Sequence, residues 1–382
     1  MKCMTAVKIC LVSNTAWSFV RFRIDVIVAL RDAGCEVLLL APPDDDVVTL
    51  KSLGVRVILL KELSRKGLNP IDDIRLYYEF KSIYQNERPD LIFQYTIKPN
   101  IYSSLAASRL GIPTIAVITG LGYAFINSGL VTWVVRRLYR LALSRVTQAW
   151  FLNQDDRDYF FRYRLVDAHK VSLIPGEGVD CHGRFNPALQ LNQNTSESEV
   201  LRFLFVGRLL YDKGIKEYVE AAAYIRQHHR NVCFQILGYL NVDNPAAVRK
   251  EELMKWVKDD IVEYLGHTDD VRPYVVQADC VVLPSYREGM STVLQESASL
   301  AKPIIASDIA GCKELVDDGV TGFLCEVKNV ASLIQQLEKF LRLSECKRRM
   351  MGNSGREKMV AEFSVERVIE RYQVEIASVR GR

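Results

Sequence analysis

Residues 280–296 read CVVLPSYREGMSTVLQE, and this stretch decides the fold class. Its first four residues are apolar and rich in valine, which predicts a short buried strand. A loop containing Gly289 follows, and either Ser291 or Thr292 can then cap a helix that carries Glu296. A strand, a glycine loop and a helix in this order are typical of an α/β protein with a parallel sheet.

The same unit recurs along the chain in two series. In the first half, six apolar segments predict strands: Val7–Val12, Glu36–Ala41, Val55–Leu60, Asp90–Tyr95, Thr114–Thr119 and Ala149–Leu152. Five more follow in the second half: Arg202–Val206, Val232–Leu237, Ile261–Tyr264, Cys280–Leu283 and Ile304–Ser307. Amphipathic stretches predict helices at Phe19–Ala33, Ile71–Asn86, Ala331–Leu343 and Val365–Ala377.

A polar stretch without hydrophobic periodicity separates the two series and has the composition of a linker. We therefore expect an N-terminal domain at residues 1–182, a linker at 183–200, a C-terminal domain at 201–362 and a final helix at 363–382. A length of 382 residues suits two domains of ordinary size.

The composition narrows the classes of function. The nine cysteines contain no C-x2-C pair, so we expect a reducing compartment, the cytosol, with neither disulfides nor a zinc site. The net charge of +4 is too small to predict a nucleic-acid-binding domain. Residues 110–135 carry no charge, but Pro113 and the turn signals at 120–122 and 127–129 argue against a transmembrane helix.

The two carboxylates of the opening stretch indicate a ligand. Glu288 lies in the loop after the strand, and Glu296 lies one to two turns into the helix. Helix N-termini favour phosphate, whereas carboxylates accept hydrogen bonds from sugar hydroxyls. A nucleotide sugar would use both features. Taken alone, however, two glutamates at this spacing also occur as solvated charges on ordinary helices.

A second motif resolves this ambiguity. Residues 203–214 read FLFVGRLLYDKG, a buried strand followed by Gly207-Arg208 and Lys213-Gly214. Together, the two motifs resemble the donor-binding core of the retaining family-4 glycosyltransferases. The resemblance implies the GT-B fold, in which two Rossmann-like parallel-sheet domains face each other across a cleft and the last helix commonly crosses back to the first domain.

The resemblance also implies roles for individual residues. Arg208 and Lys213 would neutralise the donor diphosphate, Glu288 would contact the transferred sugar, and Glu296 would accept from the ribose hydroxyls. Further donor-binding positions are Gly207, His267 and the backbone N–H groups of Gly289, Met290, Ser291 and Thr292. His267 would lie near the base, although it reads equally well as a plain loop residue. No metal or other cofactor is implied, and a UDP-sugar is the expected substrate.

The acceptor is expected at the N-terminal domain. Several segments of this half resemble enzymes that act on undecaprenyl-diphosphate-linked sugars in bacterial O-antigen and N-glycan assembly. They place Arg65, Lys66, Lys98 and Tyr123 near the acceptor, although the lysines also read as surface charges. One departure is that the loop after the first strand lacks the paired glycines of many family members.

Residues 130–145 form a basic amphipathic helix that can rest on an anionic membrane surface. We predict an apolar stripe of Val131, Val134, Val135, Leu138, Leu141 and Ala142, with Arg136, Arg137 and Arg140 on another face. The alternative is a helix that packs this stripe on its own sheet and leaves its arginines in solvent.

Three other functions must be weighed against glycosyl transfer. A dehydrogenase is not expected, because no G-x-G-x-x-G follows the first strand. A nucleotide-sugar epimerase of the same architecture, or a non-catalytic scaffold in polysaccharide assembly, stays open. The sequence does not fix the sugar, the nucleotide or the oligomeric state.

Overall fold

The computed structural model describes residues 6–64, 69–121, 129–190, 200–240 and 244–380. The chain divides into two compact units, one comprising residues 1–177 with 365–382 and the other residues 178–364. The first division falls a few residues before the boundary at 182 suggested by the sequence. The last helix belongs to the first unit, so the second unit is inserted between two segments of the first.

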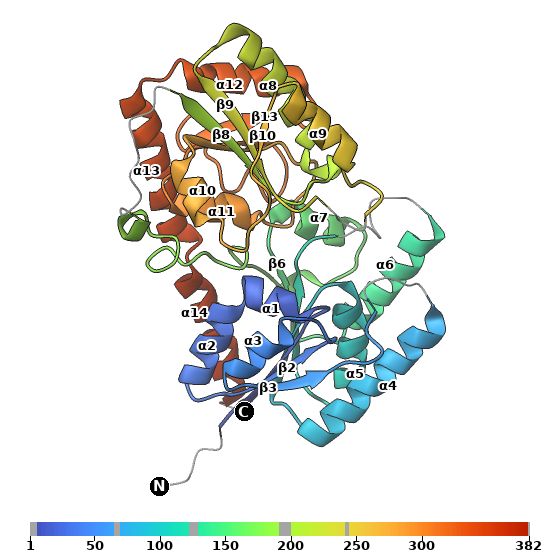
Figure 1. The fold of residues 1–382 in the computed structure, drawn as a ribbon. Helices are drawn as coiled ribbons and strands as arrows, with labels where there is room; N and C mark the ends of the chain where they lie inside the picture. Colours follow the sequence, from blue (N-terminus) through green and yellow to red (C-terminus); the bar gives the residue numbers. More distant parts are fainter. Residues whose placement is uncertain (1–5, 65–68, 122–128, 191–199, 241–243, 381–382) are drawn as a thin grey trace. The chain divides into compact units, whose positions relative to one another are not determined.

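Unit 1 contains a seven-stranded sheet in the order β3-β2-β1-β4-β5-β6-β7, with every neighbouring pair parallel (Figure 1). Its strands are β1 Lys8–Val12, β2 Glu36–Ala41, β3 Arg56–Leu59, β4 Leu91–Tyr95, β5 Thr114–Ile118, β6 Gln148–Phe151 and β7 Val171–Leu173. Its helices are α1 Ala16–Phe22, α2 Ile24–Asp32, α3 Val47–Ser52, α4 Pro70–Glu87, the π-helix η1 Pro99–Ser103, α5 Ser104–Ser108, α6 Leu130–Leu143, α7 Gln154–Arg162, the 3-10 turn η3 Ala168–Lys170 and α14 Val365–Arg380.

Unit 2 contains a six-stranded sheet in the order β10-β9-β8-β11-β12-β13, again with parallel neighbours. Its strands are β8 Leu201–Val206, β9 Val232–Leu237, β10 Glu263–Tyr264, β11 Cys280–Leu283, β12 Ile304–Ser307 and β13 Gly322–Cys325. Its helices are η4 Pro187–Gln190, η5 Tyr211–Lys213, α8 Ile215–His228, α9 Lys250–Lys258, α10 Arg272–Gln277, α11 Thr292–Ser299, α12 Val330–Leu341 and α13 Glu345–Glu362.

The expected α/β class with two Rossmann-like parallel sheets is confirmed, with three local differences. The short edge strands β7 and β13 were not predicted. The helix expected at 19–33 is two helices, because Arg23 leaves the helical region with φ −133°. The strand expected at 261–264 keeps only its last two residues.

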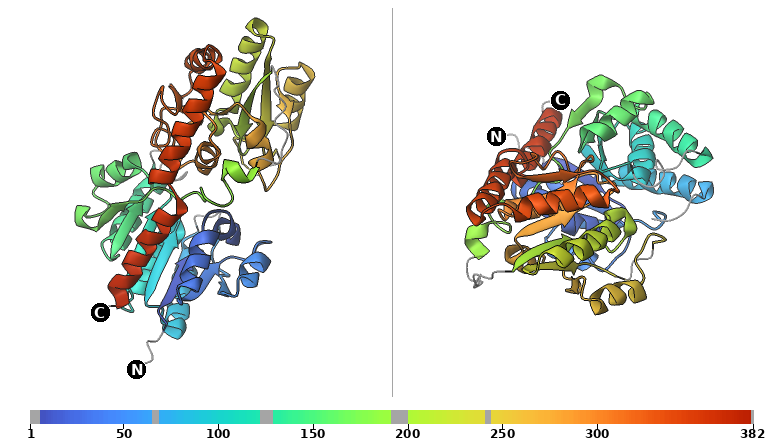
Figure 2. Two further views of the ribbon diagram at one scale, coloured as in Figure 1. Left: turned by 90° about the vertical axis from the view of Figure 1, so that its left-hand side faces the viewer. Right: turned by 90° about the horizontal axis from the view of Figure 1, so that it is seen from above.

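Helix α14 completes the core of unit 1 and runs along its sheet (Figure 2). Tyr372 is 1% exposed, and its ring centroid lies 4.5 Å from that of Phe93 and 5.1 Å from that of Trp150. The hydroxyls of Tyr372 and Tyr95 are hydrogen-bonded at 2.6 Å. The aromatic core of this unit therefore depends on residues from before and after unit 2 in the sequence.

Candidate functional site

The predicted βα unit at residues 280–296 forms β11, a loop and α11. Ser291, rather than Thr292, is the N-cap, and its hydroxyl accepts from the backbone N–H of Leu294 at 3.4 Å. Glu296 is 6% exposed and lies in the second turn of this helix. A helix N-terminus and a buried carboxylate thus follow the carboxyl end of one central strand, where open parallel sheets bind ligands.

The loops after β8 and β11 bring two of the predicted residues into direct contact. Lys213 Nζ lies 2.5 Å from Glu288 Oε1, and the two side chains are 20% and 11% exposed. An ammonium carries three donors and Glu288 takes one of them, so Lys213 can still donate to phosphate oxygens. This ion pair joins the two sequence motifs into one site.

Backbone contacts hold these loops at a fixed separation. The N–H of Tyr286 and the hydroxyl of Ser285 both donate to the carbonyl of Asp212, at 2.9 and 3.2 Å. Gly214, the N-cap of α8, has φ +72°, and a Cβ there would lie 1.9 Å from the carbonyl oxygen of Pro284. Only glycine allows this approach, so Gly214 fixes where Lys213 stands relative to the loop of Glu288.

A buried carboxylate that the sequence did not reveal supports the same loop. Glu217, in the first turn of α8, is 9% exposed, and its Oε1 accepts from the hydroxyl of Tyr286 at 2.5 Å. Burial and this carboxylate raise the pKa of Tyr286 well above its usual range, so the phenol remains a donor. The ammonium of Lys328 lies 4.7 Å from the centroid of the Tyr286 ring.

The loop after β8 carries Arg208, and the loops after β9 and β10 carry two aromatic rings that contact each other. The N–H of Leu209 donates to the carbonyl of Tyr239 at 3.1 Å, which sets the exposed Arg208 next to that loop. The ring centroids of Tyr239 and the exposed His267 are 4.2 Å apart, and Tyr239 is 54% exposed. The sequence had indicated His267 but not Tyr239. An exposed tyrosine one residue after Gly238, at a strand end, was the available signal.

One predicted donor is already in use. The backbone N–H of Ser291 donates to the carbonyl of Gly311 at 2.9 Å, so it cannot also serve a phosphate. The close approach of this loop depends on Gly311, at which a Cβ would lie 2.8 Å from the backbone of Gly289. The expected row of four backbone donors at 289–292 is therefore corrected for Ser291.

Two models of known protein families match this chain. A family model described as "Glycosyl transferase 4-like domain" matches residues 24–177, and one described as "Glycosyl transferases group 1" matches residues 189–358. Between them the two models span most of the chain. The chain thus contains a glycosyltransferase 4-like domain followed by a glycosyltransferase group 1 domain.

Two curated relatives have informative names. An N,N'-diacetylbacillosaminyl-diphospho-undecaprenol alpha-1,3-N-acetylgalactosaminyltransferase of Campylobacter jejuni is 26% identical over 94% of this chain and 96% of its own length. A UDP-Gal:alpha-D-GlcNAc-diphosphoundecaprenol alpha-1,3-galactosyltransferase of Escherichia coli is 28% identical over 83% of this chain and 82% of its own.

Solved structures share the whole fold. A glycosyltransferase from Rickettsia africae aligns with a TM-score of 0.80 and 18% identity over 98% of this chain and 99% of its own. Anabaena HepE in complex with UDP aligns with a TM-score of 0.80 and 17% identity over 97% of this chain and 100% of its own. These likenesses show that the two Rossmann-like units have the GT-B fold.

The residues predicted to contact the acceptor are only partly described. Arg65, Lys66 and Tyr123 lie outside the described residues. In unit 1, Lys98 Nζ lies 2.9 Å from Asp73 Oδ1, and the hydroxyl of Tyr102 donates to Asp73 Oδ2 at 2.6 Å. Lys98 is therefore an ion-paired residue and not the solvated charge that the sequence also allowed.

The backbone on both sides of Lys98 departs from ordinary geometry. Thr96 has φ +71°, a conformation that β-branched residues rarely adopt, and the π-helix η1 begins at Pro99. Strained residues and π-helical turns gather at functional sites because the surrounding structure must stabilise them. The carboxyl end of β4 thus remains the candidate acceptor region within unit 1.

The faces predicted for the helix at 130–145 need correction. The predicted stripe is divided between two faces: Val135 and Ala142 are buried, whereas Val131, Val134 and Leu141 are 42%, 39% and 46% exposed. Helical periodicity identifies an amphipathic helix but cannot tell which face packs on the protein.

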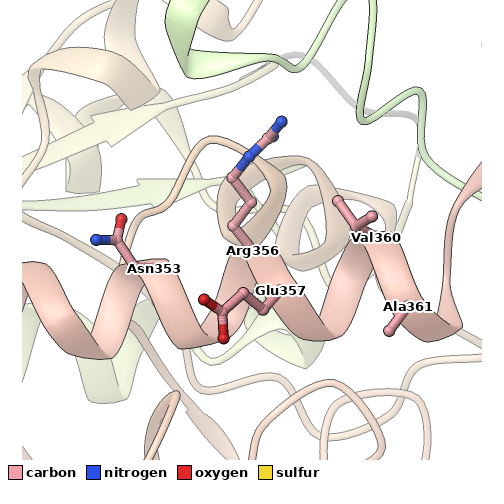
Figure 3. Close-up of a pocket in the computed structure, with 5 residues that line it drawn as sticks. All are labelled: Asn353, Arg356, Glu357, Val360 and Ala361. Atoms are coloured by element: carbon pink, nitrogen blue, oxygen red, sulfur yellow. The ribbon is translucent and has the colours of Figure 1, made fainter.

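No other feature of the described residues competes with the site at β8 and β11. They contain no group of three side chains able to hold a metal, and none of their helices is long and apolar enough to span a membrane. A hollow of about 420 Å³ is lined by residues of α13, whose side chains are drawn in Figure 3: Asn353, Arg356, Glu357, Val360 and Ala361. There, Arg356 donates to the carbonyls of Ser299 and Cys181, at 2.6 and 3.0 Å, so its role is to anchor chain segments of unit 2.

Proposed function

We propose that this glycosyltransferase moves a hexose or N-acetylhexosamine from a UDP-sugar to a lipid-diphosphate-linked sugar in bacterial surface polysaccharide or glycan assembly. The observation that carries the proposal is the Lys213–Glu288 pair at 2.5 Å, beside a capped helix that holds the buried Glu296. The two curated relatives, whose names specify diphospho-undecaprenol acceptors, support the acceptor class.

Each side chain has a distinct task in this reaction. As the bond between the sugar and the diphosphate breaks, negative charge develops on the leaving UDP. Arg208 and Lys213 stabilise that charge, with help from the N-terminus of α11. Glu288 accepts from hydroxyls of the transferred sugar, and Glu296 accepts from the ribose. Tyr239 and His267 offer their rings to the base.

Two finer properties belong to the proposal. Transfer retains the anomeric configuration, which the alpha linkages in the names of both relatives support. It needs no metal, because two cations and a helix N-terminus can supply the required positive charge. A chelator such as EDTA should therefore leave the rate of transfer unchanged, and proton NMR of the product should show an alpha linkage.

Nucleotide release is the direct test of the function. We would supply UDP-, GDP- and ADP-sugars with and without a short-chain diphospholipid sugar. We expect UDP to be released from one donor only when acceptor is present. Conversion of the donor without acceptor would replace the proposal with an epimerase. Absence of both turnover and nucleotide-sugar binding would replace it with a scaffold.

A pair of variants tests whether the named residues carry the reaction. Lys213→Met should lower kcat by about two orders of magnitude, the usual effect of losing one preorganised charge at a transition state. Lys216→Met is the matched control, because Lys216 forms an ordinary exposed pair with Glu220 at 3.8 Å on α8. Equal activity of the two variants would contradict the assigned site.

A further inference from the structure

Helix α6 presents an apolar face that nothing in the described part of the chain covers. Its exposed apolar side chains range from 39% to 77% exposed and comprise Leu130, Val131, Trp133, Val134 and Leu141. At 3.6 residues per turn, these positions fall on one side of the helix, with Arg137 among them. Contiguous exposed apolar patches on a folded protein commonly mark an interaction surface.

The other two arginines of α6 do not belong to this face. The guanidinium of Arg136 lies 3.5 Å from the ring centroid of Tyr163 and donates through Nε to the hydroxyl of Tyr159 at 3.0 Å. Arg140 donates to the carbonyls of Arg164 and Tyr163, at 2.9 and 2.7 Å. Both therefore hold the end of α7, and Arg137 is the arginine that shares the apolar face.

The stretch of sequence that contains α6 carries charges of a single sign. Between Asp90 and Asp155 the chain contains six lysines or arginines and no aspartate or glutamate. Arg145, just beyond the helix, is exposed as well. An apolar face with arginines and no acidic residues complements a surface that is apolar inside and anionic outside, as an acidic lipid bilayer is.

A second exposed stripe lies nearby within unit 1. The N-terminal half of α4 exposes Ile71, Ile74 and Tyr78, at 60%, 58% and 60%. Both Figure 1 and the right-hand view of Figure 2 show the N-terminal ends of α4 and α6 projecting on the same side of the unit. The acidic residues there are paired, Asp73 with Lys98 at 2.9 Å and Asp72 with Arg75 at 3.7 Å.

We propose that the exposed face of α6, with the first turns of α4 beside it, docks on an anionic lipid bilayer. Trp133 and the aliphatic side chains enter the interface, while Arg137 and Arg145 contact acidic headgroups. This docking proposal rests on the proposed function, because a lipid-linked acceptor lies in a bilayer and the enzyme must bind it there. It replaces the sequence expectation, in which Arg136 and Arg140 also faced the membrane.

The test is sedimentation of the full-length protein with vesicles of phosphatidylcholine, with and without phosphatidylglycerol. The wild type should bind the anionic vesicles. Serine at Leu130, Trp133 and Val134 together should weaken binding by at least about tenfold, because three interfacial side chains are lost. Serine at Val48, Val320 and Met350, which are 76%, 58% and 62% exposed elsewhere, is the matched control and should bind normally.

Single arginine variants test the orientation of the helix. Arg137→Gln should weaken vesicle binding by about fivefold, the contribution of one basic residue at an anionic surface. Arg136→Gln should leave it unchanged. An equal loss in both variants would overturn the assigned face. The membrane proposal would be overturned if the triple serine variant bound vesicles like the wild type. It would also be overturned if the wild type self-associated in analytical ultracentrifugation and the triple serine variant did not, since the face would then be an interface between copies of this chain.

Turnover separates this proposal from the proposed function. The triple serine variant should use a short-chain soluble acceptor as fast as the wild type but turn over a long-chain acceptor in vesicles more slowly. Equal losses with both acceptors would contradict docking. If the wild type uses neither acceptor, the proposed function fails, while the vesicle-binding comparison still decides the docking surface.

Discussion

Replacing Gly214 with alanine should disrupt the donor site through one backbone contact. The new Cβ would lie 1.9 Å from the carbonyl oxygen of Pro284 and 2.5 Å from its carbonyl carbon. A normal carbon–oxygen contact is about 3.3 Å, so the two loops must separate by more than about 1 Å. The left-handed conformation costs about 1–2 kcal/mol, and the overpacking about 1–3 kcal/mol more.

The total loss of unfolding free energy should therefore be about 2–5 kcal/mol. Gly319→Ala is the matched control, because Gly319 has φ +77° in the same unit but no atom within 4 Å of the added Cβ. Gly319→Ala should lose only the about 1–2 kcal/mol of unfolding free energy that the left-handed conformation costs. Urea unfolding followed by circular dichroism measures both variants at equal protein concentration.

The same displacement should weaken function, because Lys213 directly precedes Gly214. A shift of about 1 Å can lower a rate by about a hundredfold. Gly214→Ala should therefore lower both UDP affinity, measured by calorimetry, and kcat, whereas Gly319→Ala should change neither. If the two variants lose the same stability and the same donor affinity, the contact with Pro284 does not position the site.

Three further substitutions test individual assignments at the donor site. Glu296→Ala should weaken UDP-sugar binding by about 1.5–3 kcal/mol, the value of a hydrogen bond to a charged group, and unchanged affinity in calorimetry would remove its ribose role. Glu217→Leu leaves the hydroxyl of Tyr286 without its acceptor, so the loop that carries Glu288 should shift and kcat should fall about tenfold or more. Glu217→Gln keeps an acceptor for that hydroxyl and should retain most of the wild-type kcat. A loss of stability with unchanged kcat would make that pair purely structural. Tyr239→Ala should weaken UDP binding by about 1–3 kcal/mol through lost stacking. Tyr224→Ala is its control, since Tyr224 stacks on His228 at 4.4 Å on α8, and equal effects in calorimetry would exclude the base contact.

The sequence predicted those parts of the fold that local patterns encode. The βα unit at 280–296 formed as expected because its apolar strand, glycine loop and capping serine are neighbours along the chain. Strands β7 and β13 escaped prediction because each is too short to show a pattern of its own. Their pairing with longer neighbours makes them strands.

The sequence predicted which residues make up the candidate site, but not which of their side chains are in contact. The motifs named Lys213 and Glu288 separately, and only the folded loops brought them to 2.5 Å. The partner of Lys98 is Asp73, far away in the sequence, so a solvated lysine and a paired one looked alike. Glu217 was hidden for the same reason, since nothing local links it to Tyr286.

The place of α14 in unit 1 has a consequence for how the protein is made. During synthesis, residues 178–364 leave the ribosome complete, so unit 2 can fold as soon as it emerges. Unit 1 cannot, because Tyr372, which covers Phe93 and Trp150, is translated only after the whole of unit 2. Unit 1 therefore completes its fold after unit 2 has emerged, and its aromatic residues stay uncovered until Tyr372 is available.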